Sequence, residues 1–131
     1  MTRLQKVELI SGFEQTYDWF NVCWITVDNC GSCEKCRRTL LELDFLGTLE
    51  KYKNSFDIDK YKAKRDIYIS YMYSARKSDV FMKELYEYAL ANNIRISPKN
   101  KVMAYAYLVM GKIFPKALFK KIKTIVLYFT R

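Results

Sequence analysis

Residues 23–36 read CWITVDNCGSCEKC and contain every cysteine of the 131-residue chain. The spacing is C-x6-C-x2-C-x2-C, at Cys23, Cys30, Cys33 and Cys36. A C-x2-C step brings two thiolates together across a tight turn, for which Gly31 supplies backbone freedom. Cys33 and Cys36 share one face if a helix begins there. We therefore predict that the four sulfur atoms converge on one metal ion.

Zinc is the ion that this ligand set favours, because structural zinc sites take four Cys or His ligands at Zn–S distances of about 2.3 Å. Three alternatives stay open: an iron–sulfur cluster, a disulfide or redox-active thiol pair, and four unligated cysteines. Ferredoxin-type clusters carry Pro after a distal Cys, whereas Arg37 follows Cys36. Four protein ligands leave no open position, so we expect one structural ion, with Lys35, Arg37 and Arg38 offsetting its negative charge.

The side chains provide no convincing catalytic constellation. The chain has no His, which excludes Ser/His and Cys/His nucleophile pairs and every His-containing metal site. Two acidic pairs, Asp57/Asp59 and Glu84/Glu87, are explained more simply as helix caps and surface charges. We expect a protein that is not an enzyme.

The composition is that of an ordinary globular protein, with 50% apolar and 28% charged residues. The first twenty residues carry charges throughout and lack the apolar run of a secretory signal. The longest apolar run, Val102 to Met110, is too short for a membrane-spanning helix. We therefore expect a soluble cytoplasmic chain, in which residues 1–55 carry the four-cysteine zinc segment and first helix and residues 56–131 form a helical basic extension packed in the same domain.

Hydrophobic periodicity and capping residues predict a mostly α fold, a small helical domain with an N-terminal zinc-bound loop of four cysteines. Residues 2–10 fit a short helix or a strand. Ser32 is expected to cap a helix over about 33–46, and Ser78 a helix that ends at Asn92-Asn93. The other helices are expected from Asp57 or Asp59 to about Ala75, from Ser97-Pro98 to Phe114 with an interruption at Gly111, and over 116–129.

Tyrosines at helical spacing fit core packing better than base stacking. They are Tyr68, Tyr71, Tyr73, Tyr86, Tyr88, Tyr105 and Tyr107.

The net charge of +9 lies entirely in the last third of the sequence. Residues 88–131 contain nine Lys and Arg and no Asp or Glu, whereas the basic and acidic residues of the preceding part are equal in number. Such asymmetry suggests an anionic partner, although a solvated helix face explains it equally well. The alternative function is therefore a basic helical module that binds nucleic acid or an anionic membrane surface, with candidate anion-binding residues Lys116, Lys120, Lys121 and Lys123.

Residues 29–40 read NCGSCEKCRRTL, with Cys23-Trp24 upstream, and resemble the cysteine-rich C-terminal segment of PP-loop ATPases. The segment is similar to the zinc site of 7-cyano-7-deazaguanine synthase-like proteins. It resembles more closely uncharacterised bacterial relatives that read N-C-G-x-C-E-K-C-x-R-T before a Leu-rich helix and L-G-x-L, here at residues 46–49. The resemblance covers roughly residues 2–55. It implies that the four cysteines bind zinc.

The ATP-binding loop of that family is missing from this sequence. Members carry an N-terminal S-G-G-x-D-S loop, whereas this chain has only Ser11-Gly12-Phe13. The resemblance therefore implies a non-catalytic zinc module, as a fragment or a separate subunit, that docks on a PP-loop ATPase-like, nucleotide-modifying domain.

Overall fold

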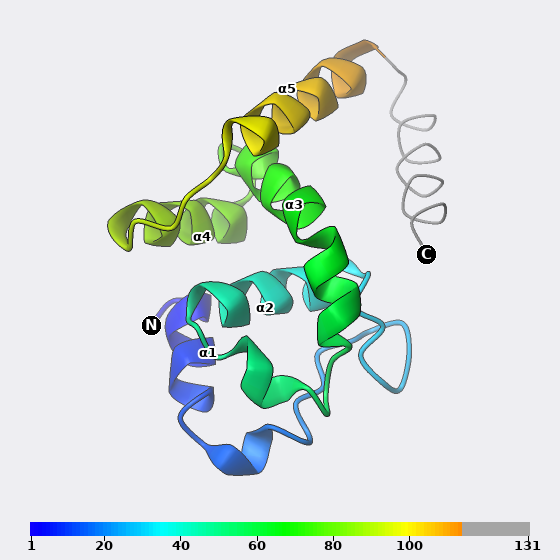
Figure 1. The fold of residues 1–131 in the computed structure, drawn as a ribbon, viewed down its shortest axis with the longest axis vertical. Coiled ribbons are helices and arrows are strands. Elements are labelled where there is room, and N and C mark those ends of the chain that lie inside the picture. The colour runs from blue at the N-terminus through cyan, green and yellow to red at the C-terminus, as the bar shows by residue number, and fades with distance from the viewer. Residues whose placement is uncertain (114–131) are drawn as a thin grey trace.

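The computed structural model describes residues 1–113, and within that range the chain is helical and contains no strand (Figure 1). The five α-helices are α1 (Arg3–Ile10), α2 (Glu34–Phe45), α3 (Ile58–Ala75), α4 (Val80–Ala91) and α5 (Pro98–Ile113). Two short 3-10 helices, η1 (Glu14–Thr16) and η2 (Leu49–Tyr52), lie between them. The predicted helical fold class is confirmed. The helix expected over 116–129 and its four lysines, Lys116, Lys120, Lys121 and Lys123, lie outside the described residues.

Side-chain caps explain where the first and third helices begin. Thr2 and Gln5 form a capping box at α1, which settles the choice between helix and strand for residues 2–10. At α3 the carboxylate of Asp57 accepts a hydrogen bond from the backbone N–H of Lys60 at 2.9 Å. Asp57, not Asp59, is therefore the cap.

The predicted caps of the second and fourth helices are each wrong by one residue. Cys33 caps α2, because its sulfur accepts the N–H of Cys36 and takes the role expected of the Ser32 hydroxyl. Asp79 caps α4, because its carboxylate accepts two backbone N–H groups. The Ser78 hydroxyl instead donates to the carbonyl of Ala75 at 3.2 Å.

Two helix ends depend on a residue with positive φ. Gly47 follows α2 with φ of +70°, and the next N–H, that of Thr48, returns to the carbonyl of Leu43. Asn93 follows α4 with φ of 55°, as the Asn92-Asn93 pair predicted. The interruption expected at Gly111 is absent, since α5 continues through it to Ile113.

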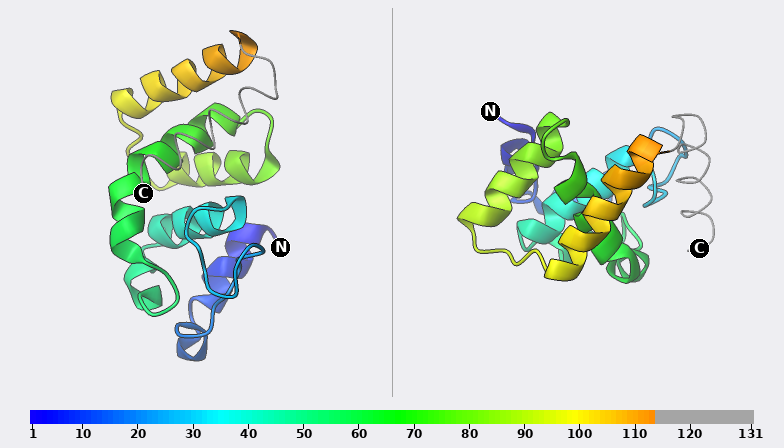
Figure 2. Two further views of the ribbon diagram at one scale, coloured as in Figure 1. Left: turned by 90° about the vertical axis from the view of Figure 1, so that its right-hand side faces the viewer. Right: turned by 90° about the horizontal axis from the view of Figure 1, so that it is seen from above.

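The helices stack in layers, with α2 in the interior. In the left view of Figure 2, α5 lies above the α3–α4 pair, which lies above α2 and α1. The buried core draws on α1, α2, η2, α3 and α4. No helix among residues 1–113 has the length and hydrophobicity needed to cross a lipid bilayer.

The tyrosines do not all lie in the core. Tyr68 is buried and packs against Tyr61, with ring centroids 5.9 Å apart. Tyr105, on α5, is exposed, so the expectation of core packing is wrong for that residue.

Candidate metal centre

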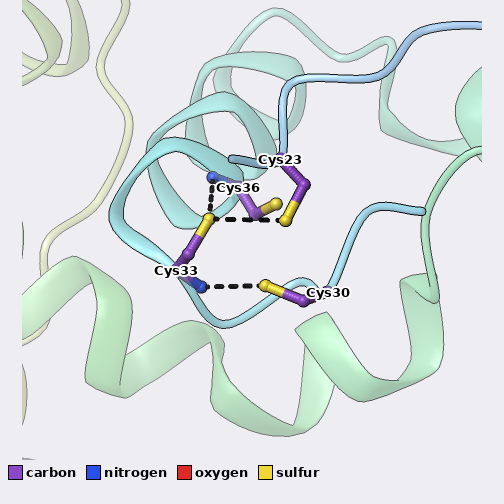
Figure 3. A group of neighbouring side chains, drawn as sticks. All are labelled: Cys23, Cys30, Cys33 and Cys36. Atoms are coloured by element: carbon purple, nitrogen blue, oxygen red, sulfur yellow. Dashed lines mark hydrogen bonds between the residues drawn. The ribbon is translucent and has the colours of Figure 1, made fainter. Parts of the chain in front are cut away.

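The four cysteines converge at one point of the structure. Their sulfur atoms all lie within 4.8 Å of one another, and no disulfide joins them (Figure 3). Four thiolates around one ion at about 2.3 Å would be separated by about 3.8 Å, the edge of the tetrahedron. The sulfur atoms of Cys23 and Cys33 are 4.0 Å apart. The arrangement therefore fits a single ion with four sulfur ligands.

Two structural elements supply the sulfur atoms. Cys23 and Cys30 lie in the loop between η1 and α2, whereas Cys33 and Cys36 belong to the N-terminal end of α2. The chain reverses at Gly31, whose φ of +70° is rarely adopted by other residues. The predicted turn and the helical i, i+3 spacing thus bring both pairs together.

Backbone N–H groups donate hydrogen bonds to the sulfur atoms of this cluster. Such N–H donors stabilise the thiolate form of cysteine, because they place partial positive charge beside it. The donors to Cys23 include Ile25 and Thr26, at 3.5 and 3.4 Å. Those to Cys30 are Ser32 and Cys33, at 3.5 and 3.3 Å, and Cys33 accepts from Cys36 at 3.4 Å.

Two polar side chains connect this loop to the rest of the fold. The Asn29 amide donates to the carbonyls of Phe20 and Ser55 at 2.7 and 2.9 Å and accepts from the N–H of Val22 at 2.9 Å. The Tyr68 hydroxyl, on α3, donates to the carbonyl of Gly31 at 2.9 Å. Both ends of the Cys30 turn are therefore fixed by neighbouring elements.

The protein environment has opposite effects on Cys23 and on the two cysteines at the start of α2. Hydrogen bonds from Thr26, first from its hydroxyl, and from backbone N–H groups lower the pKa of Cys23 to about 5. Burial raises the pKa of Cys33 and of Cys36, because a thiolate is poorly solvated there. Cys36 is fully buried. A divalent cation at the centre would supply the charge that makes the two buried thiolates stable.

The arginines of α2 lie beside the site but over aromatic rings. The Arg37 guanidinium is 5.1 Å from the ring centroid of Tyr71 and 5.8 Å from that of Tyr68. The Arg38 guanidinium is 4.1 Å from the ring centroid of Phe81, and Lys35 is exposed. The close contacts to sulfur described above come from backbone N–H groups and the Thr26 hydroxyl, not from these cations.

The acidic pairs act in helix capping and surface ion pairing. Asp57 caps α3, and Glu84 accepts the N–H of Leu4, at the start of α1, at 3.0 Å. Glu87 pairs with Lys83 one helical turn away, at 3.8 Å. These contacts agree with the interpretation made from the sequence.

Helix α2 also holds a buried carboxylate that was not predicted from the sequence. Glu42 is almost fully buried, and Arg3 donates to it at 3.0 Å and to Thr39 at 2.9 Å. Burial raises the pKa of Glu42 to about 7, although the charge of Arg3 opposes that rise. The signal was present in the sequence, because Glu42 lies within the apolar run LLEL at residues 40–43.

Comparisons with protein-family models, with curated proteins and with solved structures give no match for this chain. The resemblance of residues 2–55 to PP-loop ATPase proteins therefore stays a prediction, as does the partner that it implies.

Proposed function

We propose that this chain is a non-catalytic, structural zinc-binding module, with one Zn²⁺ held by Cys23, Cys30, Cys33 and Cys36. The convergence of four sulfur atoms within 4.8 Å of one another carries the proposal. Four thiolates complete a tetrahedral coordination shell, so no position remains at which water or substrate would bind the ion. The chemistry supplied by the ion is cross-linking, not hydrolysis.

The spacing of the sulfur atoms favours a single ion over an iron–sulfur cluster. A four-iron cluster places each thiolate on a different iron atom, and its cysteine sulfurs therefore lie further apart than four ligands of one ion. Among ions that bind four thiolates, zinc suits this role because it takes tetrahedral sulfur coordination without redox chemistry.

The loop that carries Cys23 indicates that the ion would have a structural role. Trp24, Ile25 and Val27 of this loop are exposed, so they provide little apolar burial to hold it. Coordination of Cys23 beside Cys33 and Cys36 would attach the loop to the N-terminus of α2. Zinc binding at such sites contributes on the order of 10 kcal/mol to folding.

Metal analysis of the purified full chain tests the proposal, with Cys36→Ser as the variant and Ser32→Ala as the matched control from the same turn. We expect one zinc per chain in the wild type and in Ser32→Ala, and loss of stoichiometric zinc with a lower melting temperature in Cys36→Ser. Zinc content unchanged by Cys36→Ser would contradict the assignment. Stoichiometric iron in the wild type would mean that the site is an iron centre and not a zinc site.

Thiol titration of the native protein tests the redox alternative. In the zinc-bound protein the four thiols should react slowly until a chelator is added, because coordination protects them. Rapid reaction of two thiols with zinc still bound would favour a redox protein.

A further inference from the structure

The outward face of α5 is apolar along the whole helix. Val102, Tyr105, Val109 and Ile113 recur at intervals of three or four residues and therefore share one face. Their exposed fractions are 70%, 70%, 36% and 68%. The opposite face carries the buried residues Asn100 and Ala104 and packs along α3.

Polar contacts fix the orientation of α5, so its apolar face points away from the protein. The side-chain amide of Asn100 donates to the backbone carbonyl and the carboxylate of Asp66, at 3.1 and 3.3 Å, and to the hydroxyl of Ser70 at 3.4 Å. Lys99 pairs with the same carboxylate at 3.4 Å. Rotation of α5 to bury its valines would break these contacts.

Positive charge lies beside the apolar face. By helical periodicity Lys101 and Lys112 fall along one edge of the strip that runs from Val102 to Ile113, and both lysines are exposed. No acidic residue occurs anywhere in residues 88–131, which contain nine basic ones. The carboxylate of Asp66, on α3, contacts the start of α5, and Lys99 already partners it.

We propose that α5 docks on an anionic lipid bilayer surface, lying in the plane of the interface with Val102, Tyr105, Val109 and Ile113 against the acyl chains. Helices that bind in this way combine an apolar face with flanking Lys or Arg that contact acidic headgroups. Tyr105 suits the boundary between the acyl chains and the headgroups, because tyrosine rings concentrate at that level.

The pattern of side chains favours lipid over other occupants. A second copy of the chain would bring two strongly basic segments together, and their repulsion would oppose the contact. Single-stranded RNA would use the lysines and Tyr105, but Val102, Val109 and Ile113 offer no flat ring for a base to stack on. Only a surface that is both acidic and apolar can pair with the lysines and also bury the aliphatic residues.

Cosedimentation of the full chain with lipid vesicles tests the proposal. We expect binding to phosphatidylcholine vesicles that contain phosphatidylserine and much weaker binding to phosphatidylcholine alone. The double variant Val102→Ser/Val109→Ser should bind at least about tenfold more weakly, because it removes two buried aliphatic side chains. Val80→Ser, which changes an exposed valine of α4, is the matched control and should bind like the wild type.

The lysines are tested in the same assay. Lys101→Gln and Lys112→Gln should each weaken binding about fivefold, whereas Lys77→Gln, an exposed lysine between α3 and α4, should not. Raising the ionic strength from about 0.1 M to about 1 M should reduce binding further, because the Debye length falls from about 10 Å to about 3 Å.

Three outcomes would overturn the proposal. The first is absence of binding to acidic vesicles at low salt. The second is vesicle binding that the lysine variants weaken but the double valine variant does not, which would mean electrostatic attraction without contact of the apolar face. The third is a wild type that does not bind vesicles and a double valine variant whose melting temperature is lower than that of the wild type. This result would mean that the chain itself covers this face. RNA binding with no vesicle binding would assign α5 to nucleic acid instead.

Discussion

Helices α2 and α5 are of similar length but are buried to opposite extents. Eight of the twelve residues of α2 are buried, and three of these are polar or charged, namely Arg38, Thr39 and Glu42. Only two of the sixteen residues of α5 are buried, although its sequence, PKNKVMAYAYLVMGKI, is the more apolar of the two. The more polar helix therefore lies inside, and the more apolar helix lies outside.

The difference shows that position in the fold, not local hydrophobicity, decides burial here. Helix α2 is surrounded by α1, α3 and α4 and begins at the sulfur cluster, so even its charges must find partners inside the protein. Helix α5 packs along α3 through Asn100 and Ala104, and its other face keeps apolar residues exposed. This exposed apolar face is the basis of the proposed docking of α5 on lipid.

Removal of the metal should have the largest effect, and it should act at the α2 end of the molecule. Chelation should lower the melting temperature by at least about 20 °C, because the proposed ion would cross-link the Cys23 loop to α2. Circular dichroism with and without chelator measures the change, and re-addition of zinc should reverse it. An unchanged melting temperature after complete metal removal would contradict this prediction, since α2 would then be organised without a metal at the sulfur cluster.

The buried carboxylate of α2 should make stability depend on pH. The pKa of Glu42 is about 7 in the folded protein, against an ordinary value of 4.5. Between these values the folded protein keeps a proton that the unfolded chain releases. The stabilisation is therefore complete below pH 4.5 and is lost as the pH rises through 7. Relative to Glu42→Gln, the wild type should lose about 2 to 3 kcal/mol between about pH 5 and about pH 8.

Urea unfolding of both proteins across this pH range measures the difference, and the proposed zinc site would contribute equally to each. Glu50→Gln is the control, because Glu50 is an exposed carboxylate paired with Lys62. Its difference from the wild type should stay within about 0.5 kcal/mol at every pH. The same flat difference for Glu42→Gln would mean that the carboxylate is charged in the folded protein throughout.

On the α5 side, Asn100→Ala should loosen the attachment to α3. It removes the side-chain hydrogen bonds that join Asn100 to Asp66 and Ser70 on α3, a loss of about 2 kcal/mol. Hydrogen exchange should become faster in α5 while protection of α2 is retained. Asn92→Ala, at the exposed end of α4, is the matched control. Equal loss of protection in α2 and α5 would mean that the two helices unfold together.

The smallest expected effect comes from Tyr68→Phe, which removes one hydroxyl bonded to the carbonyl of Gly31. We expect a loss of about 1 kcal/mol in unfolding free energy and weaker zinc binding, because the Cys30 turn loses its contact with α3. Competition with a chromogenic chelator measures the affinity. Tyr88→Phe is the control, since its hydroxyl makes no hydrogen bond within residues 1–113. Weakened zinc binding in Tyr88→Phe as well would remove the assigned role of the Tyr68 hydroxyl.

Local sequence rules predict most helix boundaries of this fold and the convergence of the cysteines, because both depend on short spacings and capping residues. They misplace the cap of α2, where a cysteine sulfur takes the place of a hydroxyl oxygen. They also miss the contact of Arg3 with Glu42, which joins residues 39 positions apart. Local sequence rules also fail to predict the exposure of Tyr105, because burial depends on which elements pack together.

X-ray absorption at the zinc edge of the purified chain tests the central claim most directly, because it reports the identity of the metal and the type, number and distance of its ligands. The zinc tetrathiolate assignment predicts a single shell of four sulfur atoms at about 2.3 Å. A shell containing oxygen or nitrogen ligands, or an iron signal with a second iron as neighbour, would contradict it.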